Sequence, residues 1–326
     1  MIISRTPLRV SFAGGGTDIQ DYYKTGYGAV VSAAIKKYVF VTVNRRFDDD
    51  IRVSYSKTEI VDSVDKIEHG LVREALRKVG IRNGIEITTI ADIPSRGTGL
   101  GSSAAITVGL LNSLYAFKGH RASPKKLAEE ACEIEIEKLG EPVGKQDQYI
   151  AAYGGIQRIR FNADETVLLD PVICPPKTKR DIEDHLMLFY TGKTRKSSSI
   201  LSGQKSNSEG NRATLDKMRD QAERLFKDLT SLQVDRLGEI LKEGWELKKS
   251  LTKGISDREI DLLYAKALEA GATGGKIAGA GGGGFLLLFV PPENHWAIRN
   301  SLPGLKEIEF KIEPQGSKII YVGDDF

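Results

Sequence analysis

The chain has 326 residues, which is enough for one large domain or two ordinary domains. Hydrophobic residues make up 40% and charged residues 28%, and the net charge of +3 is too small to indicate a nucleic-acid partner, although it suits an anionic ligand. No apolar run reaches membrane-spanning length, the N-terminus lacks the features of a signal peptide, and the two cysteines have neither metal-site nor disulfide-framework spacing. We therefore expect a cytoplasmic protein with no membrane partner.

The first half of the chain contains both strand-like and helix-like patterns. Apolar segments rich in β-formers predict strands, at residues 3–12, 29–35, 38–43, 51–55, 85–90, 156–161 and 166–169. Helical periodicity and capping residues predict helices, at residues 66–79, about 102–117, 123–139 and a shorter stretch after Gly144.

The second half begins after a proline-rich connector at residues 170–179, where we place the boundary between domains 1–175 and 176–326. A strand is expected at residues 186–190, followed by a polar loop at residues 192–211. The remaining expected elements are helices at 213–229, 234–252 and 257–270 and strands at 284–290, 308–312 and 318–322. Strands and helices mix in both halves, which is typical of an α+β fold in two domains.

Three segments are dense in glycine, at residues 14–16, 97–101 and 279–284. Glycine lets a backbone approach a ligand closely, and a helix that starts at such a loop directs free N–H groups and its positive dipole end at one spot, which suits phosphate. The segment at 97–103 has this setting, between a predicted strand and a predicted helix. It does not fit the dinucleotide fingerprint, because its third glycine comes one residue early, and Gly192-Lys193-Thr194 fails the Walker A spacing, because position 187 is Met. A tight turn without a ligand is the alternative for each run.

Glu135 is misplaced for a surface carboxylate, because on a helical wheel of residues 123–139 it falls near the middle of the apolar arc. A buried carboxylate needs a cation or several donors. It is either one half of a salt bridge to a buried Arg or Lys, or a ligand of a hard cation such as Mg²⁺, with a serine of the phosphate loop as a second ligand. Asp147, beside Lys145 and near a helix start, is either a helix acid stabilised by the dipole or a functional carboxylate.

Three motifs, in order along nearly the whole chain, resemble those of the GHMP kinases, the superfamily of galactokinase, homoserine kinase, mevalonate kinase and phosphomevalonate kinase. They are TPLRVSFAGGGTD at residues 6–18, PSRGTGLGSSAA at 94–105 and KIAGAGGGGF at 276–285. The GGGTD of the first motif, together with IEIEKLG, GKQDQYIAAYGG and FYTGKTRKSS, is most similar to bacterial D-glycero-D-manno-heptose 7-phosphate kinases. Fucose kinase domains share GGGTD.

The resemblance implies an N-terminal domain like ribosomal protein S5 domain 2 and a ferredoxin-like C-terminal domain, with ATP between them. It implies that the second motif binds ATP through Gly97, Gly99, Leu100, Gly101, Ser102, Ser103 and Ala104. Ser103 and Glu135 would be the Mg²⁺ ligands.

The resemblance also implies the catalytic residues. Asp147 matches the catalytic aspartate, which accepts or at least orients the hydroxyl proton of the acceptor. Arg9 matches the basic residue of the first motif, which would lie near Asp147, keep it ionised and stabilise charge on the transferring group. A salt bridge within the strand is the alternative for Arg9.

Substrate contacts are expected from the first and third motifs. Asp18 would bind sugar hydroxyls, and the residues around it and in the third glycine run would let the backbone approach the substrate; these are Gly15, Gly16, Thr17, Gly281 and Gly282. A phosphorylated sugar needs cations, for which Lys193 and Arg195 are the candidates, unless their loop is merely solvated.

The activity implied by the resemblance is transfer of the γ-phosphoryl group of ATP to the anomeric C1 hydroxyl of D-glycero-D-manno-heptose 7-phosphate. The product is the 1,7-bisphosphate used to make nucleotide-activated heptose. One alternative is another sugar 1-kinase, such as a fucose kinase, and a second is a catalytically silent, nucleotide-sensing member. Retention of Arg9, Ser103, Glu135 and Asp147 disfavours the silent member. The anomer and the oligomeric state stay open, and a homodimer is allowed.

Overall fold

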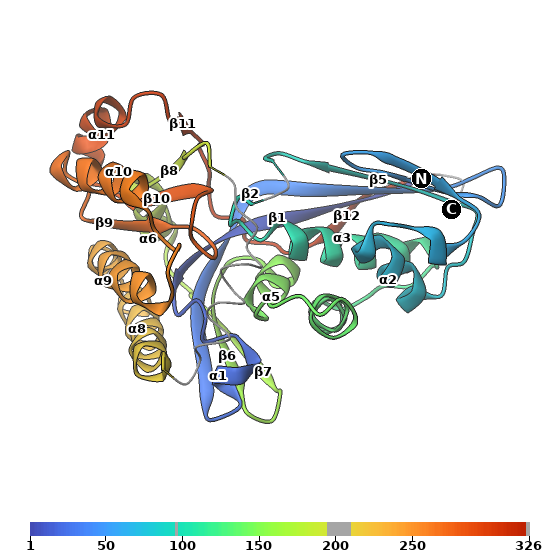
Figure 1. Ribbon diagram of the computed structural model, residues 1–326, viewed down its shortest axis with the longest axis horizontal. Coiled ribbons are helices and arrows are strands. Elements are labelled where there is room, and N and C mark those ends of the chain that lie inside the picture. Colours follow the sequence, from blue (N-terminus) through green and yellow to red (C-terminus); the bar gives the residue numbers. More distant parts are fainter. Residues whose placement is uncertain (95–96, 194–209, 324–326) are drawn as a thin grey trace.

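The computed structural model describes residues 1–94, 97–193 and 210–323. Within them lie an eight-stranded and a four-stranded sheet, each with helices packed against it (Figure 1). Across these residues, no helix combines the length and apolarity that crossing a bilayer requires.

The eight-stranded sheet is organised around two long strands near the N-terminus. Its strand order is β12-β1-β2-β5-β3-β4, with β6 also paired to β2 and β7 paired to β6, and β3 with β5 is the parallel pair. The strands are β1 Ile2–Ala13, β2 Tyr27–Arg45, β3 Ile51–Ser54, β4 Thr58–Val61, β5 Ile85–Ala91, β6 Ile156–Asn162, β7 Val167–Pro171 and β12 Lys318–Val322.

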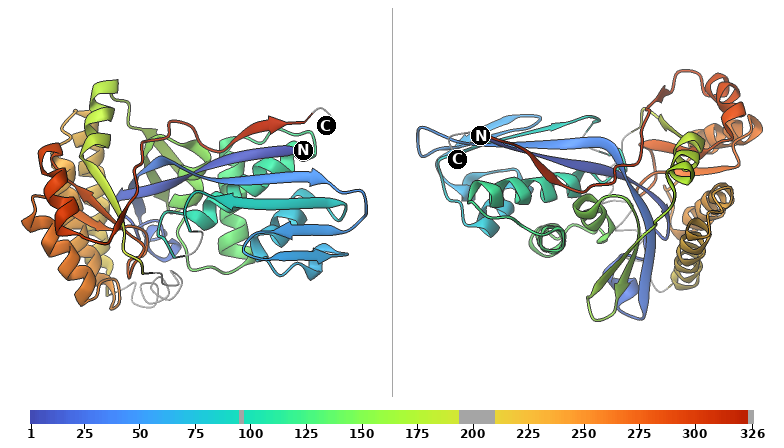
Figure 2. Two further views of the ribbon diagram at one scale, coloured as in Figure 1. Left: turned by 90° about the horizontal axis from the view of Figure 1, so that it is seen from above. Right: turned by 180° about the vertical axis from the view of Figure 1, so that it is seen from behind.

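The N-terminal helices lie against one face of this sheet, as the two views in Figure 2 show. Among them, α3 is apolar on nearly every side and is buried between β1, β2 and the neighbouring helices. The helices are α1 Gln20–Tyr23, the 3₁₀ turn η1 Val64–Lys66, α2 Gly70–Val79, α3 Ser102–Phe117, α4 Pro124–Cys132, the π-helical turn η2 Glu133–Lys138 and α5 Gln146–Tyr153.

The four-stranded sheet has the order β11-β8-β10-β9 and is antiparallel throughout. Numbered along the chain, this is the order 4-1-3-2, and helices follow the first and third strands, which is the ferredoxin-like arrangement. Its elements are α6 Pro176–His185, β8 Leu186–Tyr190, α8 Arg212–Thr230, α9 Arg236–Leu251, α10 Arg258–Glu269, β9 Gly274–Ile277, β10 Phe285–Phe289, η3 Pro292–Asn294, α11 His295–Ser301 and β11 Lys306–Glu307.

The predicted α+β fold is confirmed, and the local differences have physical reasons. The strands predicted at 29–35 and 38–43 are one strand, β2, whose pairing with β1 shifts register between Pro7 and Leu8. The predicted connector contains α6, because Pro176 begins a helix, a position where the missing proline N–H costs nothing. Residues 308–312 are not a strand; Ile312 makes a single bridge to Ile35.

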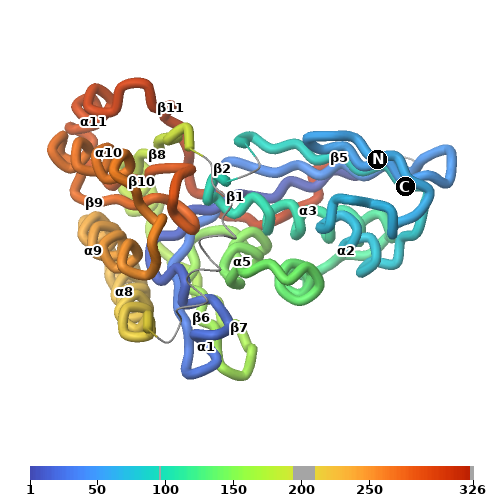
Figure 3. Tube along the Cα trace, viewed as in Figure 1, coloured from blue at the N-terminus to red at the C-terminus, as the bar shows by residue number. Residues whose placement is uncertain are grey.

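The predicted boundary at residue 175 lies between β7 and α6. However, β12 pairs with β1, so the chain returns to the first sheet near its end, and both ends lie close together (Figure 3). The exact division into 1–175 and 176–326 stays a prediction.

Candidate active site

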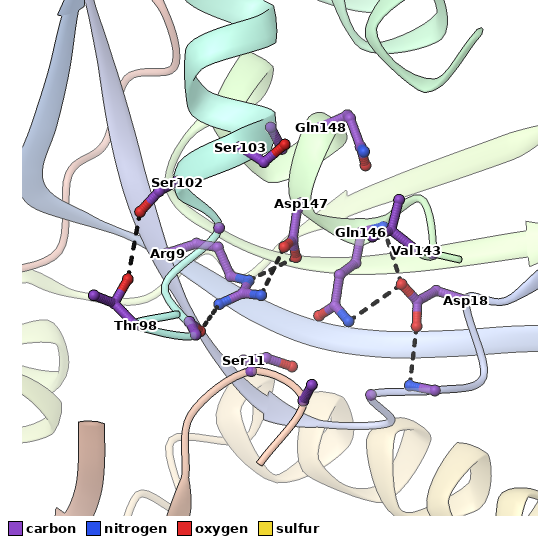
Figure 4. Close-up of a pocket in the computed structure, with 18 of the residues that line it drawn as sticks. Arg9, Ser11, Asp18, Thr98, Ser102, Ser103, Val143, Gln146, Asp147 and Gln148 are labelled. Atoms are coloured by element: carbon purple, nitrogen blue, oxygen red, sulfur yellow. Dashed lines mark hydrogen bonds and ion pairs between the residues drawn. The ribbon is translucent and has the colours of Figure 1, made fainter. Parts of the chain in front are cut away.

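A cavity of about 190 Å³ lies where the two sheets and their helices meet (Figure 4). Its walls come from β1, the glycine loop before α3, η2, the start of α5, α9, β9 and the loop after β9. The lining residues are Arg9, Ser11, Gly15, Gly16, Asp18, Ile19, Gly97, Thr98, Gly99, Gly101, Ser102, Ser103, Ala104, Glu135, Val143, Gly144, Gln146, Asp147, Gln148, Lys248, Lys276, Gly279 and Ala280.

One side of the cavity is formed by the glycine-rich loop at residues 97–101, here called the phosphate loop, and by the start of α3. Gly101 is the residue before the helix, with φ of 75°, and no side chain caps the first turn. The first N–H groups of the helix have no intrahelical acceptor, so this end suits an anion. Every predicted ATP-binding residue except Leu100 lines the cavity. The Leu100 side chain is buried, and its carbonyl accepts a hydrogen bond from the Arg9 backbone N–H at 3.0 Å.

The second and third motifs cross at Gly99 and Gly279, with no room for a side chain. A Cβ on Gly99 would lie 2.3 Å from the Ala278 carbonyl oxygen, and one on Gly279 would lie 2.4 Å from Gly99 Cα. This backbone crossing brings the third motif into the wall of the cavity.

Arg9 and Asp147 form a two-pronged ion pair in the middle of the site (Figure 4). Arg9 Nε donates to Asp147 Oδ1 and Nη2 donates to Oδ2, both at 2.7 Å. The remaining nitrogen, Nη1, donates to the Gly99 carbonyl oxygen at 2.5 Å, which ties the pair to the phosphate loop. The Arg9 side chain is 6% exposed and that of Asp147 25% exposed, so the carboxylate is the more accessible partner.

Asp18 is buried beside this pair and accepts hydrogen bonds on both oxygens. Oδ1 accepts from the Gly16 N–H at 2.9 Å, and Oδ2 accepts from the backbone and side-chain nitrogens of Gln146, each at 3.2 Å. Burial and the nearby charge of Asp147 raise the pKa of Asp18 above its usual value. Gly144 packs against the carboxylate, since a Cβ there would lie 2.0 Å from Oδ2.

Glu135 lies in the π-helical turn η2 and is 1% exposed, so its predicted burial is confirmed. The alternative of a salt bridge to a buried Arg or Lys is wrong, because the hydrogen-bond partners of Glu135 are uncharged. Ser103 Oγ donates to Oε2 at 2.6 Å, and Gln148 Nε2 donates to Oε1 at 3.1 Å. Burial raises the pKa of Glu135 to about 7. Such π turns occur often at functional sites.

The residues around Glu135 fit a hard cation. The Gln148 Oε1 atom is buried with no hydrogen-bond partner in the described chain, so a third oxygen is available beside those of Glu135 and Ser103. The described part of the chain contains no cluster of three or more His, Cys, Asp or Glu side chains that could hold a metal ion. A cation held here must take most of its ligands from phosphate oxygens and water, as Mg²⁺ does.

Several predicted substrate residues lie outside the cavity lining. Thr17 is buried, and its hydroxyl donates to the carbonyls of Gly14 and Ala29. Gly281 and Gly282 pack against Ile255.

The predicted phosphate cations are not part of the cavity lining either. The ammonium group of Lys193 pairs with Asp257 at 2.8 Å and Glu259 at 2.7 Å. Arg195 lies outside the described residues.

The sequence analysis missed Gln146, Gln148, Ser11 and two lysines that line the cavity, Lys248 and Lys276. A signal for Lys248 was present, because it lies on the apolar face of α9 with Leu241, Gly244, Trp245 and Leu251, at helical spacing. Lys276 begins the third motif. Ser11 and the two glutamines carried no signal beyond their proximity to motif residues.

Comparison with known proteins agrees with this geometry. Residues 42–155 match the family described as GHMP kinases N terminal domain, and residues 225–302 match GHMP kinases C terminal. Together the matches cover more than half of the chain. The protein therefore belongs to the GHMP kinases and is an ATP-dependent phosphotransferase.

Individual relatives show which kinds of GHMP kinase the chain resembles. The chain is 30% identical to the D-glycero-alpha-D-manno-heptose 7-phosphate kinase of Campylobacter jejuni, over 92% of this chain and 93% of that protein. It is 27% identical to the mevalonate kinase of Methanothermobacter thermautotrophicus, over 80% of this chain and 83% of that protein. It is 25% identical to the bifunctional fucokinase/GDP-fucose pyrophosphorylase of Arabidopsis thaliana, over 94% of this chain but 31% of that protein.

The solved structure of a D-glycero-D-manno-heptose 1-phosphate kinase from Bacteroides thetaiotaomicron has the same fold. It matches with a TM-score of 0.81 at 24% identity, over 99% of this chain and 100% of that chain.

Proposed function

We propose that this sugar kinase transfers the γ-phosphoryl group of ATP to the anomeric C1 hydroxyl of D-glycero-D-manno-heptose 7-phosphate. The products are ADP and the 1,7-bisphosphate, an intermediate for nucleotide-activated heptose. The observation that carries the proposal is the Arg9–Asp147 pair beside the phosphate loop, in a chain 30% identical to a heptose 7-phosphate kinase over 92% of its length.

In this proposal the first turn of α3 holds the ATP phosphates through its N–H groups. Ser103 and Glu135 would hold Mg²⁺, which neutralises phosphate charge when bound. Hydrogen bonds within the protein hold these groups in place, since Ser103 donates to Glu135 and Arg9 donates to the Gly99 carbonyl oxygen. Phosphoryl transfer depends mostly on such positioning and charge stabilisation.

Asp147 is the residue that receives the acceptor hydroxyl. Its partly exposed carboxylate orients the C1 O–H, whose oxygen attacks the γ-phosphorus in line with the departing ADP, and it accepts or passes on the proton. Arg9 stabilises the charge that builds up on the transferring group. Asp18, with Gly15 and Gly16, binds sugar hydroxyls through the carboxylate lone pairs that Gly16 and Gln146 leave free. Lys193 is a further predicted contact, which requires its pairs with Asp257 and Glu259 to open.

The test is ADP release from Mg²⁺–ATP with a panel of acceptors: D-glycero-D-manno-heptose 7-phosphate, mannose 6-phosphate, sedoheptulose 7-phosphate, fucose, galactose and mannose. Turnover with heptose 7-phosphate well above the others, and a product with phosphate on C1 by ³¹P NMR, is the expected result. Preference for fucose would favour the fucokinase alternative, which the similarity to the plant fucokinase supports. ATP binding without turnover of any acceptor would point to a nucleotide-sensing protein.

A further inference from the structure

Two lysines are buried in the cavity wall formed by the second half of the chain. Lys248, from α9, is 5% exposed, and Lys276, from β9, is 4% exposed. Both line the cavity. The Lys248 ammonium donates to the Gly279 carbonyl oxygen, and that of Lys276 donates to the Phe12 carbonyl oxygen at 3.3 Å. An ammonium group has three donors, so each lysine has donors left for a ligand.

Neither lysine has a carboxylate within ion-pair distance in the described part of the chain, whereas Lys193 has two. Burial and the positive charge of Arg9 lower the pKa of Lys248 to about 8, against the weaker opposing effect of Asp18 and Asp147. Burial, Lys248 and Arg9 lower the pKa of Lys276 well below its usual value. Burying two ammonium groups beside an arginine is unfavourable unless an anion joins them.

Ser11 gives a second, independent observation that points to a ligand. Its hydroxyl is buried, lines the cavity and has no hydrogen-bond partner among the described residues. It faces Gly15, since a Cβ there would lie 3.7 Å from Ser11 Oγ, and it directly precedes Phe12, whose carbonyl binds Lys276. Hydroxyl and ammonium donors together are the groups that bind a phosphate monoester.

Ser11 lies apart from the predicted Mg²⁺ ligand Ser103, while Lys248 is joined through Gly279 to Gly99 of the phosphate loop. In the view of Figure 4, Ser103 and Ser11 are on opposite sides of the Arg9–Asp147 pair. An anion bound by the Ser11 hydroxyl would therefore lie on the side of the Arg9–Asp147 pair away from Ser103.

We propose that Lys248, Lys276 and Ser11 form the subsite for the phosphate group that the acceptor already carries. This rests on the proposed function, in which the acceptor is a sugar phosphate. A neutral sugar would leave both ammonium groups unpaired, so the subsite selects phosphorylated acceptors. Lys193 would have to give up two carboxylates to do the same.

The experiment compares acceptor pairs that differ only in the phosphate: heptose 7-phosphate against heptose, and mannose 6-phosphate against mannose. The variants are Lys248→Met and Lys276→Met, which keep the apolar stem and remove the charge. Lys249→Met is the matched control, on the same helix but partly exposed and paired with Glu246 at 2.9 Å. Thermal unfolding of each variant without ligands checks that it folds. Lys248→Arg tests whether a positive charge at this position restores the preference for phosphorylated acceptors.

The expected result is that the kcat/KM ratio of phosphorylated to unphosphorylated acceptor falls about 30-fold or more in Lys248→Met and Lys276→Met. The KM for ATP stays as in the wild type, Lys249→Met keeps the ratio, and Lys248→Arg restores part of it. Inorganic phosphate should compete with the sugar phosphate and not with ATP, and it should do so more weakly in both cavity variants.

Three results would overturn the subsite. An unchanged ratio with a large loss of kcat for both acceptors assigns the lysines to the transferring phosphoryl group. A rise in the KM for ATP assigns them to the nucleotide. Loss of the ratio in Lys193→Met alone assigns the acceptor phosphate to Lys193. A wild-type enzyme that prefers unphosphorylated sugars rejects the proposed function itself, before any variant is compared.

Discussion

The two walls of the cavity hold their charged side chains differently. On the wall formed by β1, η2 and α5, the carboxylates of Asp18, Glu135 and Asp147 each accept hydrogen bonds from two or more donors within the protein. On the wall formed by α9 and β9, Lys248 and Lys276 each donate to a main-chain carbonyl and to no carboxylate of the described chain. The carboxylates of the first wall are thus held in place by the protein itself, whereas the ammonium groups of the second wall have donors left for an anion.

Asp147→Asn breaks the first wall at its centre and should have the largest effect. The amide keeps the shape of the side chain but loses the charge that pairs with Arg9 and the ability to take a proton. We expect kcat to fall about 10²–10⁴-fold, the range for a positioned acid or base, with ATP affinity unchanged by isothermal titration calorimetry. Asp170→Asn is the control, since Asp170 pairs with Arg158 at 2.6 Å away from the cavity. Unchanged kcat in Asp147→Asn would remove Asp147 from catalysis.

Glu135→Gln tests whether the buried carboxylate serves a cation. The substitution keeps the size of the side chain but removes the charge that Mg²⁺ requires. In a Mg²⁺ titration of ATP binding, the apparent affinity for Mg²⁺ should therefore fall about 10–100-fold. Glu133→Gln, two residues away on the surface and paired with Lys78 at 2.5 Å, should behave as the wild type. An identical Mg²⁺ titration in Glu135→Gln would make Glu135 a purely structural hydrogen-bond acceptor.

Gly144→Ala tests how finely Asp18 is placed. The added Cβ would lie 2.0 Å from Asp18 Oδ2, so the carboxylate or the loop must move. We expect kcat/KM for the acceptor to fall about 10-fold, within the known cost of a small misplacement, while the KM for ATP is unchanged. Gly26→Ala, with nothing within 4 Å of its Cβ, is the control. Normal acceptor kinetics in Gly144→Ala would argue against a sugar contact at Asp18.

Lys248→Met removes a buried positive charge from the second wall. Its effect, on the stability of the free enzyme, is the smallest of the four predicted effects. The pKa of Lys248 is about 8 in the folded protein, whereas the usual value of 10.5 applies to the unfolded chain. Between these pH values the unfolded chain therefore binds more protons than the folded protein. The resulting cost to stability is fully present below about pH 8 and fades as the pH rises towards 10.5.

Lys248→Met should therefore raise the free energy of unfolding by about 1–3 kcal/mol at pH 7, with the gain disappearing near pH 10. Chemical denaturation across this pH range measures it, with Lys249→Met as control. A destabilised Lys248→Met at pH 7 would mean that the ammonium group is satisfied without a ligand.

The sequence predicted the first wall better than the second, for reasons that particular residues make clear. Glu135 was found because a carboxylate interrupts an apolar helical face, and the same reasoning applied to α9 would have found Lys248. Ser11 lies in β1, whose residues from Thr6 to Ala13 are all buried, so no polar–apolar alternation distinguishes it.

The fold was predictable to the level of its elements but not of its long-range pairings. The apolar pattern located both parts of β2 and the interruption between them, but only the register with β1 shows that the strand continues. The pairing of β12 with β1 depends on a contact between opposite ends of the chain, which local patterns cannot reveal.

That pairing has a consequence for how the protein is made. β1 carries Arg9 and Ser11, and one edge of its first residues is covered by β12, which is synthesised after every other strand of the two sheets. Until then the nascent chain presents an open strand edge, which can pair with other chains. The order of synthesis therefore leaves this edge of β1, the strand that carries Arg9 and Ser11, unpaired until β12 has formed.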